Sequence, residues 1–203
     1  MSFFTLSLIV SYSLVVVLNI IFAFSWTTLL NIFICLVIIM LPAAVFLFVG
    51  RALPKSWFNS DRRRFKVNKF ENLICRGTKV KEWKDKIPVG GRVAGFRLNQ
   101  LSKPRDVNFL SRYIYESCFA EWLHAICSIY GILSLVIIFL INKSFILPIA
   151  LPIALVFAYQ NMASVIIQWF TRPRIVKLRE AVVKKNEGSG FYSTIDINKK
   201  EEI

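Results

Sequence analysis

The sequence predicts an all-α integral membrane protein with about four transmembrane helices and a basic cytoplasmic loop between the second and third. Three observations favour this fold class: 56% of the 203 residues are hydrophobic, the first charged residue is Arg51, and apolar and charged residues fall into separate blocks. A helix crosses about 30 Å of hydrocarbon in roughly 20 residues. The formal net charge of +14 would also suit a nucleic-acid binder, but the segregation into blocks indicates a lipid bilayer as partner and no nucleic acid.

Residues 1–50 are expected to form a hairpin of two transmembrane helices. This uncharged stretch is too long for one span and long enough for two, which we place at about 3–23 and 29–50. Residues 25–28, Ser-Trp-Thr-Thr, are the expected turn between them. Pro42 is expected to bend the second helix, because proline removes a helical hydrogen bond.

Residues 118–172 are expected to form a second transmembrane hairpin. Its two apolar blocks run from about 118 to 141 and from 145 to 170. Only Asn142, Lys143 and Ser144 separate them, so the two helices must be antiparallel neighbours.

The positive charges predict the topology. Residues 51–112 carry 17 Lys and Arg against five Asp and Glu, the chain from Arg172 onward carries eight more Lys and Arg, and the second hairpin tip carries Lys143. If four helices alternate, 25 of the 26 positive charges lie on one side, which the positive-inside rule assigns to the cytoplasm. The sequence therefore predicts a multi-pass plasma-membrane protein with both termini cytoplasmic, a cytoplasmic loop at residues 51–117 and a polar cytoplasmic tail at 173–203.

The loop is rich in aromatic residues, which indicates an amphipathic segment lying on anionic headgroups. Its Asp61-Arg62-Arg63-Arg64 cluster allows two interpretations: a topology anchor, or a basic face that binds a phosphorylated donor or an acidic carrier protein. From Lys184 the tail is polar and is expected to be mobile. The four cysteines form no CxxC motif and are expected to be free thiols.

Glu121 and His124 are the ionisable residues of the third apolar block, and their i, i+3 spacing puts them on one helix face. Ser128 and Gly131 continue that face and indicate close helix packing. One interpretation is catalytic: His124 is a general base whose tautomer Glu121 fixes. The alternative is an interfacial glutamate and a structural histidine. A metal site that adds Cys127 is disfavoured, because the chain has no second histidine.

The fourth block carries a polar stripe of Asn161, Ser164, Gln168 and Arg172 at helical spacing. In lipid such a stripe should face the other helices, either as interhelical hydrogen-bonding residues or as the wall of a substrate cavity opposite the histidine. Arg172 and Arg174 flank a proline at the end of the block. Their guanidinium groups could bind phosphates or mark the membrane boundary.

Three motifs in order carry a family resemblance. They are Val-Lys-Glu-Trp-Lys-Asp-Lys-Ile-Pro at 80–88, Ala-Glu-x-x-His at 120–124, and the segment from Asn161 to Thr-Arg-Pro-Arg at 171–174. Together with residues between 53 and 71, they resemble the glycosyl-4,4'-diaponeurosporenoate acyltransferase family of staphyloxanthin-type carotenoid biosynthesis. The resemblance covers roughly residues 50–178 and implies transfer of a fatty acyl group to a sugar hydroxyl of a glycosylated terpenoid acid.

The main hypothesis is therefore a membrane O-acyltransferase in which His124, held by Glu121, deprotonates a sugar hydroxyl that attacks an acyl thioester. The acceptor would be a glycosylated carotenoid or another glycolipid. Acyl-CoA or an acidic acyl carrier protein would be the co-substrate, with no bound cofactor and no metal. Asn161 and Gln168 would bind the sugar or stabilise the oxyanion. Phosphates would be held by Lys84, Lys86, Arg172 and Arg174. The expected substrate-binding residues are Trp83, Lys84, Lys86, Asn161, Gln168, Arg172 and Arg174.

Two rival functions remain open from the sequence. One is a non-catalytic membrane protein that binds lipid or scaffolds a biosynthetic complex. The other is a small membrane methyltransferase or reductase, which needs a nucleotide-cofactor pocket. Gly90, Gly91 and Gly95 do not follow a strand or open a helix at phosphate-loop spacing, which disfavours that reading.

Overall fold

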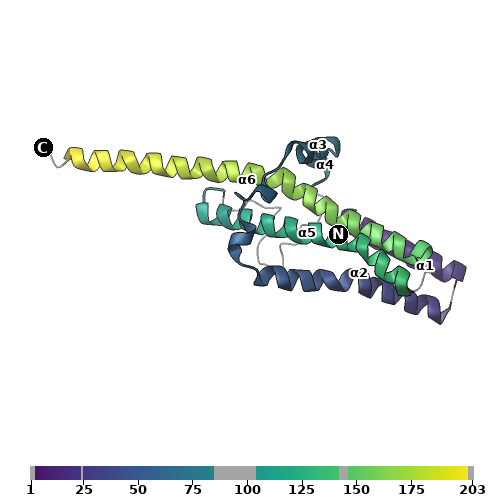
Figure 1. Cartoon of the computed structure of the whole chain (residues 1–203). Coiled ribbons are helices and arrows are strands. Elements are labelled where there is room, and N and C mark those ends of the chain that lie inside the picture. The colour runs from purple at the N-terminus through teal and green to yellow at the C-terminus, as the bar shows by residue number, and fades with distance from the viewer. Residues whose placement is uncertain (1–2, 24, 85–103, 142–145, 201–203) are drawn as a thin grey trace.

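The protein is helical throughout the residues that its computed structural model describes, which are 3–23, 25–84, 104–141 and 146–200 (Figure 1). No strand occurs among these residues. The long helices are α1 (Phe3–Ala23), α2 (Trp26–Ala52), α5 (Val107–Ile141) and α6 (Leu151–Lys200). The short helices are η1 (Lys55–Phe58), η2 (Arg63–Phe65), α3 (Lys69–Gly77), α4 (Val80–Trp83) and the π-helical η5 (Ile146–Ala150).

Three of the described segments are long and apolar enough to cross a membrane: α2, α5 and residues Pro148–Glu187, most of which belong to α6. Large apolar side chains cover their outer faces. Phe48 of α2 is 73% exposed and Leu140 of α5 is 78% exposed, a degree of exposure that lipid tolerates and water does not. The predicted all-α membrane fold is therefore confirmed.

An antiparallel pair, α5 and α6, forms the centre of the bundle (Figure 1). Helix α2 packs along α5, and α1 packs against α2 and the start of α6. Small and β-branched side chains fill the core where the four helices meet, including Ile39 of α2, Cys127 of α5 and Ile153 of α6. The C-terminal part of α6 extends beyond the other helices (Figure 1).

Prolines at the start of α6 explain the position of α1. Pro152 has no N–H to donate to the carbonyl of Pro148, four residues earlier in the chain. That carbonyl instead accepts a hydrogen bond from the side chain of Asn19 in α1, with an Nδ2–O distance of 3.0 Å. Because an unpaired carbonyl is costly in an apolar bundle, this bond ties α1 to the α5–α6 pair.

Two helices are longer than the sequence predicts. Helix α5 begins at Val107 rather than at 118, because the carboxylate of Asp106 accepts hydrogen bonds from the backbone N–H groups of residues 108 and 109. The polar tail expected from Lys184 is helical, because α6 continues to Lys200. Its segment directly after the apolar block, residues 174–187, is rich in Lys, Arg and Glu, which are strong helix formers.

Part of the predicted loop is an ordered helical unit packed on α6. Asn68 and Glu71 form a reciprocal capping box that starts α3. Cys75 of α3 and Val80 of α4 are buried against Ile166 and its neighbours in α6. The first half of the loop is therefore fixed beside the bundle, whereas residues 85–103 lie outside the described part of the chain.

The end of the bundle that carries Arg51 and the loop, called here the basic end, is sealed by aromatic rings. Phe58 of η1 is buried in edge-on contacts with Tyr115, Phe119 and Trp122 of α5. Arg51, at the end of α2, forms a two-bond ion pair with Glu116 of α5, with N–O distances of 2.8 and 3.1 Å. These contacts hold α2 and the loop against α5.

Replacing Gly131 by alanine should destabilise the bundle. A Cβ atom there would lie 2.8 Å from Cδ1 of Phe157, a buried ring that the core around it prevents from moving. We expect a loss of about 1–3 kcal/mol, measured as a lower thermal unfolding temperature in detergent. Gly77→Ala is the control, because a Cβ atom at Gly77 has no neighbour within 4 Å and should leave the unfolding temperature equal or slightly higher. Equal unfolding temperatures for Gly131→Ala and the wild type would contradict the close α5–α6 approach.

Candidate functional site

The polar stripe of α6 faces α5 and forms a ladder of side-chain contacts with it. Gln168 accepts a hydrogen bond from Ser117, Asn161 bonds His124, and Arg172 pairs with Glu121. One turn after His124 in α5, the hydroxyl of Ser128 donates to the carbonyl of Ala158 in α6 at 3.0 Å. These contacts, called here the polar ladder, confirm that the two polar faces predicted from helical spacing meet inside the bundle.

The ladder runs inward from the basic end. Its first member, Ser117, is next to Glu116, which pairs with Arg51 where the uncharged N-terminal segment ends. At 1.5 Å per residue, His124 lies about 12 Å further along α5 than Glu116. The histidine is therefore inside the apolar part of the bundle, about 12 Å along α5 from the ion pair at the basic end.

His124 is held by Asn161. Its ring Nδ1 lies 2.8 Å from Oδ1 of Asn161, while Nδ2 of the same amide donates to the carbonyl of Phe157 at 2.8 Å. An amide oxygen only accepts, so the ring must carry its proton on Nδ1. In the neutral ring Nε2 then keeps its lone pair, which is the state that a general base requires.

The predicted pairing of Glu121 with His124 is not what the structure shows. The carboxylate of Glu121 instead binds the guanidinium of Arg172, whose second nitrogen donates to the carbonyl of Phe65 at 2.6 Å. Only 2% of Arg172 and 7% of Glu121 is exposed. A carboxylate buried this deeply needs a full counter-charge, which a neutral imidazole cannot supply, so Arg172 is the stronger partner.

The ladder engages the two predicted amides. Asn161 binds His124 through Oδ1 and the carbonyl of Phe157 through Nδ2, so it orients the histidine. Gln168 is 2% exposed and its Oε1 accepts from Ser117 at 2.8 Å. Ser164, the other member of the stripe, bonds the carbonyl of Gln160 in its own helix at 3.3 Å.

The remaining predicted binding residues lie away from the ladder. Trp83 donates from its indole to the carbonyl of Thr78 at 2.7 Å and so closes the α3–α4 unit. Lys84 follows at the end of α4, and Lys86 lies outside the described residues. Arg174 binds the carbonyl of Phe170 and lies over its ring, on another side of α6 from Arg172.

Sequence reasoning did not identify two members of the site. Ser117 lies in the segment assigned to the loop, although its place one turn before Glu121 puts it on the same helix face. The carbonyl of Phe65 is a backbone group, for which the sequence holds no signal. Within the described residues no group of three His, Cys, Asp or Glu side chains is placed to hold a metal ion. All four cysteines are unpaired, as predicted.

Two cavities open at the basic end. One of about 380 Å³ lies between the loop and α6 and is bordered by Phe65, Lys66 and Arg172, so it reaches the outer end of the polar ladder. The other, of about 360 Å³, lies between α3 and α6. His124 lines neither of them, and the first of the two adjoins the ladder at Arg172.

One comparison with known proteins identifies a family. A protein-family model described as glycosyl-4,4'-diaponeurosporenoate acyltransferase matches residues 54–181, more than half of the chain. The match includes all the residues of the polar ladder and of both cavities, and it confirms the resemblance seen in the ordered motifs. No curated protein and no solved structure matches the chain.

Replacing one partner of the buried ion pair should destabilise the protein more, per residue replaced, than replacing both partners together. Glu121→Leu leaves Arg172 without its counter-charge, and Arg172→Met leaves Glu121 without its own, so each single variant should lose about 3–5 kcal/mol. The double variant should lose clearly less than the sum, because no unpaired charge remains. Thermal unfolding of the four proteins in one detergent measures this. Strictly additive losses would show that the two side chains do not depend on each other.

Proposed function

We propose that this chain, which belongs to the glycosyl-4,4'-diaponeurosporenoate acyltransferase family, is a membrane enzyme that moves a fatty acyl group from a thioester donor to a sugar hydroxyl. The acceptor is a glycosylated terpenoid or another glycolipid. The single observation that carries the chemistry is the hydrogen bond from Nδ1 of His124 to Asn161, because it leaves Nε2 of the histidine as a base.

In the proposed reaction, Nε2 of His124 takes the proton of the sugar hydroxyl as its oxygen attacks the thioester carbonyl. The C–O bond forms and a tetrahedral oxyanion results. When the oxyanion collapses, the C–S bond breaks and the leaving thiolate takes the proton back from the imidazolium. The ester and the free thiol are the products, and the histidine returns to its starting state.

The low-dielectric setting favours a neutral histidine at rest and makes its orientation important. Asn161 supplies that orientation, because its own amide is fixed by the carbonyl of Phe157. An amide is uncharged, so it adds no charge beside the histidine. Glu121 and Arg172 act differently from the sequence hypothesis: their ion pair holds α5 against α6 and the loop, and so keeps the histidine in place.

The proposal includes the topology predicted from the charges. Helix α1 has 21 residues, enough for a span, and would cross as the first of four helices. Arg51 at the end of α2 pairs with α5 at the same end of the bundle where Arg172 lies. The positive-inside rule assigns this basic end to the cytoplasm, where acyl-CoA and acyl carrier protein are available, and leaves both termini on that side.

Replacing His124 by alanine should reduce acyl transfer by roughly 10²–10⁴-fold, the usual contribution of a general base. The assay is ester formation by purified protein in lipid, followed by mass spectrometry of the lipid product. Ile129→Ala is the matched control, because Ile129 is on the same helix with 61% of its surface exposed. A His124→Ala protein that transfers acyl groups at the wild-type rate would refute the mechanism. A purified wild-type protein that forms no ester, with His124→Ala lowering only the yield of folded protein, would favour the non-catalytic scaffold.

Replacing Asn161 by alanine should lower turnover by a smaller factor, about tenfold or more, because the base remains but its tautomer and orientation are no longer held. The same assay measures the effect. Met162→Ala is the control, since Met162 is the next residue in α6 and is 40% exposed. An Asn161→Ala protein as inactive as His124→Ala would mean that Asn161 acts on the substrate directly.

A further inference from the structure

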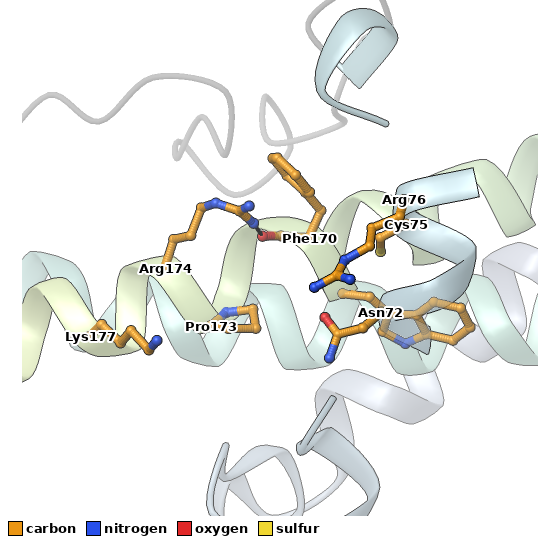
Figure 2. A pocket seen from close by; sticks show the side chains of 8 residues that line it. Asn72, Cys75, Arg76, Phe170, Pro173, Arg174 and Lys177 are labelled. Carbon is orange, nitrogen blue, oxygen red and sulfur yellow. Dashed lines mark hydrogen bonds between the residues drawn. The ribbon is translucent and has the colours of Figure 1, made fainter. Parts of the chain in front are cut away.

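The cavity between α3 and α6 lies on the side of α6 that faces away from the polar ladder. Helical periodicity puts its α6 residues on the opposite face from Gln168 and Arg172. Figure 2 shows Asn72 and Arg76 of α3 on one side of this space, and Pro173, Arg174 and Lys177 of α6 on the other. At about 360 Å³ it is near the lower limit for a small-molecule pocket, so it fits a headgroup rather than a whole lipid.

The described lining of this cavity is basic. Arg76, Arg174 and Lys177 border it, and none of the described residues that line it is acidic. The second cavity shares Pro173 and Lys177 with the first, but Asp61 and Glu180 lie among its basic residues. Three cations around one concave space repel one another, and an anion that binds among them relieves that repulsion.

Two contacts prepare the cavity for an anion. Arg174 is held by the carbonyl and the ring of Phe170, with its guanidinium carbon 3.5 Å from the ring centroid, so little side-chain entropy is lost when it binds. Arg76 forms no ion pair with any other described residue. Figure 2 shows its guanidinium next to the amide of Asn72, whose Nδ2 donates to the carbonyl of Asn68 at 3.1 Å, so the guanidinium is the donor that Arg76 offers to an anion.

The one thiol in the described lining of the cavity, that of Cys75, is unsuited to act as a nucleophile. Cys75 lies in its wall, but burial raises the pKa of this thiol, and its Sγ is 3.8 Å from the carbonyl of Ile166, to which it donates. A buried thiol with a raised pKa is a poor nucleophile. Next to it, Phe70 and Leu73 of α3 are 67% and 65% exposed, which is expected of a helix that rests at the membrane interface.

We propose that the cavity between α3 and α6 binds a phosphate ester whose remaining part lies at the membrane interface. Arg76, Arg174 and Lys177 neutralise the phosphate. The phosphate comes from one of two sources: the headgroup of an anionic phospholipid, or the phosphates of a coenzyme A thioester. Binding of the phosphate stands on the cavity alone, while its use to position an acyl donor rests on the proposed function.

The test is phosphate binding by the purified full chain in phosphatidylcholine nanodiscs. One arm titrates coenzyme A by calorimetry, and the other adds phosphatidylglycerol to the nanodiscs and counts retained lipid by native mass spectrometry. Arg76→Gln and Lys177→Gln should each weaken binding about tenfold, which is the effect of one charge-assisted hydrogen bond. Lys69→Gln in α3 and Lys185→Gln in α6 are matched controls, because both lysines are exposed and border neither cavity.

Every outcome of these two binding experiments either supports the proposed phosphate site or rejects it. Loss of coenzyme A binding in the two cavity variants, with the controls unchanged, identifies the thioester donor as the source. The same pattern with phosphatidylglycerol identifies the lipid headgroup. A wild-type protein that binds neither probe, or cavity variants that bind as the wild type does, would overturn the proposal. His124→Ala should bind the probes normally, so a failure of the transfer mechanism leaves this result untouched.

Discussion

The buried ion pair between Glu121 and Arg172 is the interaction on which the arrangement of this protein depends. Either charge alone, in an apolar bundle, would cost several kcal/mol. The two side chains must therefore meet, and Arg172 meets Glu121 only when α6 packs antiparallel to α5 in one register. That register also brings Ser117 to Gln168 and His124 to Asn161. The second nitrogen of Arg172 binds the carbonyl of Phe65, which extends the constraint to the loop.

Helix α6 separates two kinds of chemistry on its two sides. The side toward α5 is dry and nearly charge-neutral, because its one cation is paired and its amides are engaged with partners. There a neutral imidazole keeps its lone pair. The side toward α3 carries Arg174 and Lys177 in a cavity whose described lining includes no acidic residue. The matched family residues, 54–181, include both sides, whereas α1 and α2 lie outside the match and contribute packing through Asn19 and Arg51.

The sequence by itself determined the periodic features of this protein. Fifty uncharged residues require helices in lipid, and the spacing of Asn161, Gln168 and Arg172 puts them on one face of whatever helix they occupy. The spacing of Glu121 and His124 does the same. Both inferences follow from backbone geometry alone, which is why the polar faces, the membrane fold and the family could be predicted before the partners were known.

Only the tertiary structure decided which of these groups bind each other. Glu121 has a possible partner one turn away in His124 and another 51 positions away in Arg172, and the sequence favours the near one. The distant one binds because a buried carboxylate gains more from a guanidinium than from a neutral ring, and because helix packing brings the long arginine side chain within reach. The same packing placed α3 against α6 and grouped Arg76 with Lys177, a proximity that follows from no local spacing in the sequence.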